Sequence, residues 1–190
     1  MEAIHPKASK PLELANIDIR IKNTFEPEHP GTLITKEYVS EIPKIEIVSG
    51  TDKVLAVEIH DPMMVGEVGF DLRIMQIFAK YNVSYILKST NANSITMVVW
   101  DNYKSREMIT DLETTFYQVI VERVALVCVM GTNIALPGFL YRASKALFQK
   151  GINVESFAQS LRQVNMQFVI KREFYKDAVI ALNDELCIEK

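Results

Sequence analysis

The 190-residue sequence is poor in the residues that build disulfide frameworks, metal sites and phosphate loops. It has only two cysteines, whose positions favour buried thiols in a reducing compartment over a disulfide framework. Its three histidines, His5, His29 and His60, lack the spacing of metal ligands. No glycine-rich loop joins a strand to a helix in the way that phosphate binding requires. These absences disfavour a metalloprotein and a nucleotide-binding enzyme.

Long apolar runs and a large excess of charge are also missing. No apolar stretch reaches the roughly 18 to 20 residues of a membrane span, and the first ten residues lack the apolar core of a signal peptide. The net charge of −3 offers no basic field to nucleic acid or to an anionic membrane. We therefore expect a cytoplasmic protein that binds neither nucleic acid nor membrane.

What the sequence does contain is an internal repeat. Residues 53–100 read as strand, glycine-bearing loop, helix, strand, turn and strand, and residues 123–171 repeat this order. The motif Gly69-Phe70-x-x-Arg73 returns as Gly138-Phe139-x-x-Arg142, an offset of 138 − 69 = 69 residues. The repeat predicts two similar units instead of one large domain.

Hydrophobic periodicity predicts the elements of each copy. The first copy has strands over 54–59, 83–87 and 94–99, helices over 70–80 and 104–119, and a turn over 90–93. A strand over 44–48 and a turn over 49–52 precede it, and a helix over 174–186 closes the second copy. The predicted fold class is α+β, with two ferredoxin-like units, each an antiparallel sheet with two helices on one face.

Two features of this plan stay open. Each unit lacks an obvious fourth strand, and the segments at 44–48 and 120–121 are candidates, so the sequence does not decide whether the units are interlocked. Residues 1–35 hold a short helix (8–15), two short strands and a proline-rich loop, too little to cover a sheet. They either pack on the rest of the chain or are the tail of a domain whose body is elsewhere.

The motifs resemble those of a known family. Asp61…Gly66-x-x-Gly69-Phe70, and Pro137-Gly138-Phe139 followed by Gly151-Ile152-Asn153-Val154, resemble ACT domains, the amino-acid-sensing modules of biosynthetic enzymes. With His5-Pro6-Lys7-Ala8 and the stretch at 19–34 in front, the chain resembles the C-terminal part of aspartate kinase (aspartokinase). The resemblance implies a remnant of an amino-acid kinase domain at 1–35, a first ACT domain with its linker strand at 36–119, and a second ACT domain at 120–190.

The family also indicates what this chain lacks. Aspartate kinases carry a Lys-Phe-Gly-Gly-type segment that handles phosphates and a later Gly-Arg-Gly-Gly-Ser-Asp-like loop, and neither occurs here. Phosphoryl transfer requires a positioned nucleotide and Mg²⁺. We therefore expect no catalytic residue, no metal and no cofactor in this chain, the ATP and magnesium belonging to the parent kinase. The chain is expected to be either a separate regulatory subunit or a fragment.

The resemblance also implies an effector site where two ACT domains pack together. The residues that it indicates are Met64, Gly66, Gly69, Phe70, Asp71, Tyr85, Ile86, Lys88 and Asn91, with Ile152 and Asn153 from the second unit. Backbone N–H groups at a helix start suit a ligand carboxylate, and an acidic side chain suits its ammonium group. The alternative is that the glycines and Asn153 are ordinary turn residues and Phe70 is core.

The effector itself stays open among lysine, threonine and methionine. Lysine-sensing members of the family have an aspartate where Ile86 stands and a Ser-Glu pair where Asn91-Ala92 stands, which argues against lysine. Asp71 is a possible substitute, although the helix dipole explains an acid there equally well. Lys88 stands where threonine-sensing members have glutamine, and we expect it to point outward or to pair with an acid.

The sequence thus predicts an allosteric regulatory region of an aspartate kinase. It binds an end-product amino acid as a homodimer formed through its ACT domains, and it controls phosphorylation of L-aspartate by a catalytic domain or subunit. The main alternative is a stand-alone ACT-type sensor or dimerisation module for another enzyme. A true enzyme and a scaffold without ligand are the remaining alternatives.

Overall fold

The computed structural model describes residues 4, 6–35, 38 and 40–187 and divides the chain into an N-terminal unit, residues 1–41, and a C-terminal unit, residues 42–190. His5 of the family motif lies outside the described residues. No helix within the described ranges is long and apolar enough to cross a bilayer.

The N-terminal unit contains one helix and one pair of strands. Helix α1 (Pro6–Leu14) is followed by β1 (Ile19–Ile21) and β2 (Thr32–Ile34), which pair in antiparallel fashion. Gly31 opens β2 at a φ of +73°, and a Cβ there would overlap the carbonyl oxygen of Ile21. Phe25, in the loop between the strands, is 93% exposed. The predicted helix and strands are confirmed, and this unit leaves apolar side chains uncovered.

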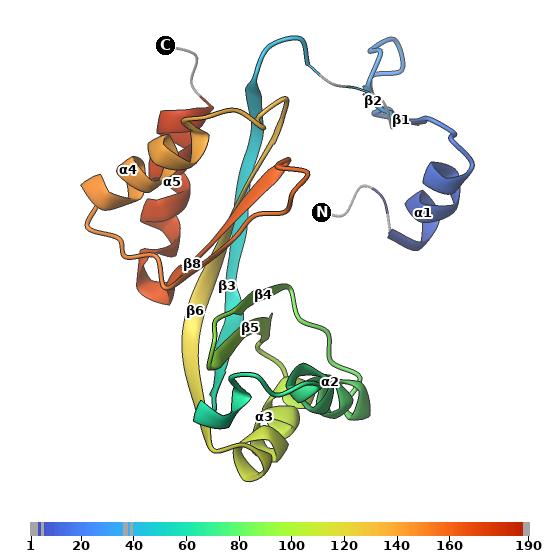
Figure 1. The fold of residues 1–190 in the computed structure, drawn as a ribbon. Coiled ribbons are helices and arrows are strands. Elements are labelled where there is room, and N and C mark those ends of the chain that lie inside the picture. Colours follow the sequence, from blue (N-terminus) through green and yellow to red (C-terminus); the bar gives the residue numbers. More distant parts are fainter. Residues whose placement is uncertain (1–3, 5, 36–37, 39, 188–190) are drawn as a thin grey trace. The chain divides into compact units, whose positions relative to one another are not determined.

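The C-terminal unit is built on one six-stranded antiparallel sheet (Figure 1). Its strand order is β4-β5-β3-β6-β8-β7. The strands are β3 (Lys44–His60), β4 (Leu87–Thr90), β5 (Ser94–Trp100), β6 (Gln118–Thr132), β7 (Ser156–Ala158) and β8 (Asn165–Lys171). The helices are α2 (Phe70–Lys80), α3 (Tyr103–Thr115), α4 (Phe139–Gln149) and α5 (Tyr175–Leu186), with single 3-10 turns η1 (Pro62–Met64) and η2 (Arg172–Phe174).

Two long strands interlock the copies of the repeat. β3 and β6 pair from Lys44↔Thr132 to His60↔Gln118. β5 pairs with only the later part of β3, and β8 pairs with only the later part of β6. We call residues 54–123 the first half, and residues 44–53 with 124–187 the second half. Each half takes one strand segment from the other copy, which answers the question that the sequence left open.

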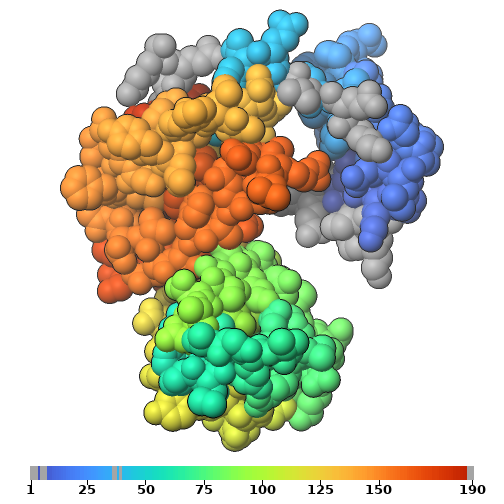
Figure 2. Space-filling view, viewed as in Figure 1, coloured from blue at the N-terminus to red at the C-terminus, as the bar shows by residue number. Residues whose placement is uncertain are grey.

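Each half packs its own pair of helices on one face of the shared sheet (Figure 1). Figure 2 shows the two halves as separate masses, the first in green to yellow and the second in orange to red. Helices α2 and α3 cover a core that includes Val57, Met97 and Leu112. Helices α4 and α5 cover a core that includes Val127, Phe168 and Leu182. The predicted α+β fold, with antiparallel strands and two helices on one face of each ferredoxin-like unit, is confirmed by this arrangement, although the two units share a single sheet.

The opposite face of the sheet carries a third apolar cluster. It joins residues of both halves, namely Val54, Leu87, Val98, Val124, Leu126 and Val169. The two edge strands, β4 and β7, contact each other although they lie at opposite ends of the strand order. The sheet therefore curls, so that its central strands are covered by apolar side chains on both faces.

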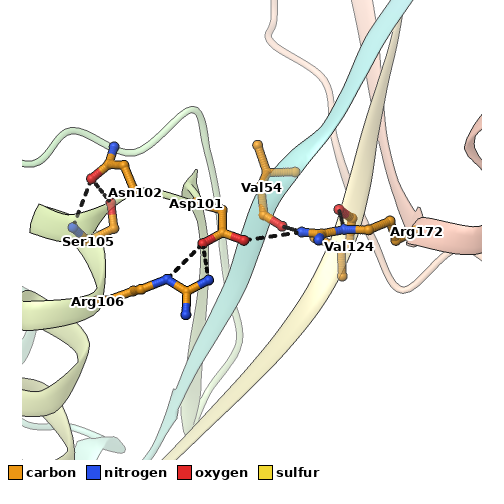
Figure 3. Close-up of polar contacts among 7 residues, drawn as sticks. All are labelled: Val54, Asp101, Asn102, Ser105, Arg106, Val124 and Arg172. Atoms are coloured by element: carbon orange, nitrogen blue, oxygen red, sulfur yellow. Dashed lines mark hydrogen bonds and ion pairs between the residues drawn. The ribbon is translucent and has the colours of Figure 1, made fainter.

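An ionic junction lies where the halves meet (Figure 3). Asp101 follows the last residue of β5 and Arg172 follows the last residue of β8, so the two occupy equivalent places in the repeat. The Arg172 guanidinium donates to the carbonyl oxygens of Val54 (2.8 Å) and Val124 (3.5 Å) and lies 3.6 Å from the Asp101 carboxylate. Arg106 holds the other oxygen of Asp101 at 2.7 Å. Arg172 thus joins both central strands to the first half.

Three predicted boundaries are wrong. The predicted turn at 49–52 is part of β3, because the strand continues its pairing with β6 and accommodates one extra residue in a register shift between Thr51 and Val54. The predicted strand at 83–87 begins only at Leu87 and includes Lys88 and Thr90, because the preceding residues close α2. Helix α3 ends at Thr115 with Phe116 as its C-cap, and Val119 belongs to β6.

Candidate functional site

The candidate site in the first half begins with the loop between β3 and α2. Asp61 accepts a hydrogen bond from the Met63 backbone N–H at 2.9 Å and so caps the 3-10 turn η1. Gly69 is the N-cap of α2 at a φ of +89°, which favours glycine, and no side chain caps the helix there. The next residue, Phe70, is buried against Phe116 with ring centroids 5.5 Å apart. The loop therefore presents an uncapped helix start that a buried aromatic ring holds in place.

An ion pair links this helix start to the edge strand. The Nζ atom of Lys88 in β4 lies 2.6 Å from the Oδ2 atom of Asp71 in the first turn of α2. Lys88 is paired with Met97 in β5, and Met97 belongs to the core under α2 and α3, so both side chains face the helices. The Lys88 side chain is 21% exposed and that of Asp71 is 51% exposed. The expectation that Lys88 points outward or pairs with an acid is met by its pairing.

The remaining predicted residues of the first half lie in the loop before α2, just before β4 and in the turn after β4. Met64 packs against the first-half core, and Gly66 takes a φ of +79° in the loop. The ring of Tyr85 meets that of Phe78 edge-on at 6.5 Å. Ile86 donates its N–H to the Val98 carbonyl oxygen at 2.7 Å. Asn91 donates its N–H to the Ser94 carbonyl oxygen at 2.8 Å and closes the turn after β4.

The two residues predicted from the second unit lie in the other half of the sheet. Ile152 is buried in the core under α4 and α5. The Asn153 side-chain amide donates to the Glu155 carboxylate at 3.2 Å, just before β7. The structure thus gathers the first-half residues around one loop, one helix start and one edge strand, and it places Ile152 and Asn153 in the neighbouring half.

An apolar surface surrounds this site, and the sequence motifs did not predict its extent. Four side chains of the loop and of α2 are exposed, and we call them the loop patch: Met63, Val65, Val68 and Leu72. Val68 is 99% exposed. Apolar residues in a short loop bounded by glycines would have been the signal, because such a loop has no core of its own. An exposed apolar cluster around a candidate site is typical of an interaction surface.

Charged groups hold α2 at both of its ends. At the start, Arg73 lies 3.5 Å from Glu67 and stacks over the rings of Phe70 and Phe116. At the end, Lys80 lies 2.7 Å from Asp111 in α3. This hydrogen bond lowers the pKa of Asp111 and raises the pKa of Lys80. The helix that carries the candidate site is therefore fixed against α3.

A separate hollow opens on the sheet face opposite the helices. Its walls include the carboxylates Glu58, Glu122 and Glu155, and none of the predicted effector residues lines it. The Thr96 hydroxyl donates to Glu58 at 2.9 Å.

Both cysteines are free, and burial raises the pKa of the Cys128 thiol, which disfavours its thiolate.

Comparison with known proteins identifies this arrangement. Residues 127–186 match the family model described as ACT domain. The chain is 38% identical over 189 residues to aspartate kinase Ask_Ect of Stutzerimonas stutzeri. The alignment covers 98% of this chain and 40% of that protein. The chain therefore spans about two fifths of that relative's length.

Solved structures share the fold. The aspartate kinase of Clostridium acetobutylicum matches 98% of this chain and 45% of its own, with a TM-score of 0.85 at 24% identity. E. coli aspartokinase III, solved in complex with lysine and aspartate, matches 97% of this chain and 42% of its own, with a TM-score of 0.76 at 19% identity. The regulatory subunit of aspartate kinase from Thermus flavus matches 75% of this chain and 98% of its own, with a TM-score of 0.66 at 16% identity. At these identities the likeness concerns the fold.

The doubled β-α-β-β-α plan is an ACT-type fold, and the ACT family model matches its second copy. Over nearly its whole length the chain is homologous to aspartate kinases, and it has the fold of their regulatory regions.

Proposed function

We propose that this chain is the allosteric regulatory region of an aspartate kinase. It binds an end-product amino acid of the aspartate pathway, namely lysine, threonine or methionine, and controls the ATP-dependent phosphorylation of L-aspartate by a catalytic domain or subunit. One observation carries the proposal. The chain forms an interlocked ACT-type unit, and 98% of the chain aligns with an aspartate kinase. The E. coli relative of the same fold, solved with lysine and aspartate, supports an amino-acid ligand.

The first half supplies groups that suit an amino acid. The uncapped N–H groups at the start of α2 and the Lys88 ammonium suit a carboxylate. The Asp71 carboxylate, beside them, suits an α-ammonium group. We assign no ATP, magnesium or catalytic residue to this chain. We place the protein in the cytoplasm.

The partner that completes the site is a second copy of the chain. The loop patch leaves four apolar side chains uncovered beside the ion pair, and β4 is an edge strand of the sheet. A two-fold contact through the loop patch buries these side chains and encloses the ligand at the same time.

The regulatory step follows from linkage. An effector that binds one arrangement of the paired ACT units more tightly than another shifts the population toward that arrangement. The N-terminal unit, with its paired strands and exposed Phe25, is the proposed remnant of the kinase domain on which that shift acts. If this unit is instead a disordered leader of a stand-alone sensor, limited proteolysis will remove it before any other part of the chain.

Thermal melting of the purified chain against lysine, threonine and methionine tests the proposal. A ligand at 100 times its dissociation constant stabilises by about 2.7 kcal/mol, a shift of several degrees for a chain of this size. We expect at least one of the three to raise the melting temperature and a coupled ADP-release assay to show no turnover. A melting temperature that stays the same with lysine, threonine and methionine would leave only the alternative of a scaffold without ligand.

The dimer has its own test. Val68→Asp places a charge in the loop patch, and we expect it to give monomers in analytical ultracentrifugation and to abolish the amino-acid shift. Leu161→Asp is the matched control, because Leu161 is equally exposed in a turn of the second half. Dimers of the Val68 variant that still respond to the amino acid would rule out this interface.

A further inference from the structure

The ion pair between Lys88 and Asp71 has a consequence for which amino acid fits the site. Asp71 is the one acidic residue among the eleven predicted effector residues. Its Oδ2 atom is already 2.6 Å from the Lys88 ammonium. Glu67, the acid next nearest in the loop, is paired with Arg73 at 3.5 Å. Within the described residues of the site, the Lys88 ammonium and the Asp71 carboxylate are therefore paired with each other.

Lys88 cannot easily turn away from this position. Its neighbour across the ladder, Met97, is fully buried, and the Lys88 side chain is only 21% exposed. The stem of the side chain is therefore held against the sheet, while its ammonium reaches Asp71 at the partly exposed end of the pair. The geometry of β4 thus directs Lys88 toward Asp71.

We infer that Lys88 is a specificity-determining residue that excludes basic amino acids, so that the effector carries an uncharged side chain. This inference rests on the proposed function, because it concerns the same site. The α-ammonium of any amino acid takes the second oxygen of Asp71, so the side-chain ammonium of a basic amino acid finds no other carboxylate among the predicted effector residues and faces the positive charge of Lys88 and of the helix start. An effector with an uncharged side chain meets no such repulsion. Its α-carboxylate lies toward Lys88 and its α-ammonium toward Asp71.

The structure of the first half supports this assignment at a second position. Ile86, which precedes β4, packs against the apolar cluster on the other face of the sheet and offers no charge to a ligand. Asn91 is engaged by its backbone in the turn after β4. Neither residue offers a ligand a carboxylate in place of that of Asp71, which is paired with Lys88.

Calorimetric titration of the full chain with lysine, arginine, threonine and methionine tests the inference. For the wild-type chain we expect threonine or methionine to bind at least about tenfold more tightly than lysine or arginine. In Lys88→Met the carboxylate of Asp71 is freed, and we expect the affinity for lysine to rise about tenfold while the uncharged ligand loses affinity. Lys88→Gln serves as a second variant if Lys88→Met does not fold, as judged by its unliganded melting temperature.

The matched control is Lys80→Met, which removes the same charge from the other end of α2. It should leave the ratio of lysine to threonine affinity unchanged. Lysine binding to the wild-type chain as tightly as the uncharged amino acids overturns the inference and leaves the proposed function standing, as does an unchanged ratio in Lys88→Met. Silence of the wild-type chain and of every variant toward all four ligands overturns both.

Discussion

The two halves of the C-terminal unit share a backbone plan but differ where the first helix of each half begins beside its edge strand. In the first half, Asp71 and Lys88 form an ion pair at this place. Leu140 and Phe157 stand at the equivalent positions, 69 residues later (140 − 71 = 157 − 88 = 69). Phe157 packs against Phe168, with ring centroids 5.1 Å apart, in the second-half core. One plan thus carries a charged pair in one half and an apolar contact in the other.

The backbone at these places is the same in both halves. Gly69 and Gly138 are both helix N-caps with positive φ, +89° and +107°. Asn82 and Gly151 both follow the helix with positive φ, 53° and 68°. Backbone turns therefore set the fold of each half, whereas two side chains decide whether a half offers polar groups to a ligand.

The largest predicted effect tests whether the halves are one folding unit. Phe168→Ala removes a fully buried ring from the second-half core and should lower the free energy of unfolding by about 3–5 kcal/mol. Because both halves share β3 and β6, Trp100 at the end of β5 should report the same lowered urea midpoint by fluorescence as circular dichroism does. The control is Met97→Ala at the equivalent position of the first half (168 − 97 = 71). A Trp100 transition that keeps its wild-type midpoint would show that the halves unfold separately.

A smaller loss is expected at the junction of the halves. Arg172→Met removes the donor to the carbonyl oxygens of Val54 and Val124 and leaves Asp101 with Arg106 alone. We expect a loss of about 1–3 kcal/mol, since partly buried acceptors lose their partner. Urea unfolding measures it, and Arg172→Lys, which keeps the charge, should lose less. An Arg172→Met variant as stable as wild type would mean that the shared strands alone hold the halves together.

Exchanging the side chains that distinguish the halves should change binding more than stability. The double variant Asp71→Leu with Lys88→Phe gives the first half the apolar residues of the second. We expect its free energy of unfolding to stay within about 1 kcal/mol of wild type, because a partly exposed ion pair contributes little. Its thermal response to threonine or methionine should disappear. Retention of that response would place the ligand elsewhere.

The smallest effect concerns the ion pair that joins α2 to α3. Lys80 lowers the pKa of Asp111 below its usual value of 3.8, so this contribution to stability is present above about that pH and is lost as the pH falls through the lowered pKa. The pKa of Lys80 is raised above its usual 10.5, so on that side the contribution is lost as the pH rises above that value. Asp111→Asn should therefore be less stable than wild type at pH 7, by a margin that shrinks toward pH 2. Urea midpoints at the two pH values measure this, and a difference that does not change with pH would contradict it.

The sequence predicted the fold of each half because its signals are local. Glycine spacing located both helix starts, and the apolar stripe located α2 and α5 almost to the residue. It misjudged the middle of β3, because the Ser49–Asp52 stretch has turn composition while its strand pairing depends on β6, where the partner of Ser49 lies 128 − 49 = 79 residues away. Long-range pairing overrides local propensity there.

The site could be predicted only in part for the same reason. Local motifs indicated the loop, the helix start and the residues of β4, but the partner of Lys88 is 17 residues away and depends on how α2 packs on the sheet. The junction between Asp101 and Arg172 is equally invisible in sequence, because the two residues meet only when the halves interlock. Side-chain contacts across elements follow from tertiary packing, which periodicity does not encode.

Site-resolved hydrogen exchange with and without threonine or methionine tests most directly whether the first half is the sensing half. We predict that a bound amino acid slows exchange at the loop and helix start around 61–72 and at 85–91. The equivalent second-half segments around 130–141 and 154–160 should change less. Protection confined to the second-half segments would contradict the assignment, as would no protection at all.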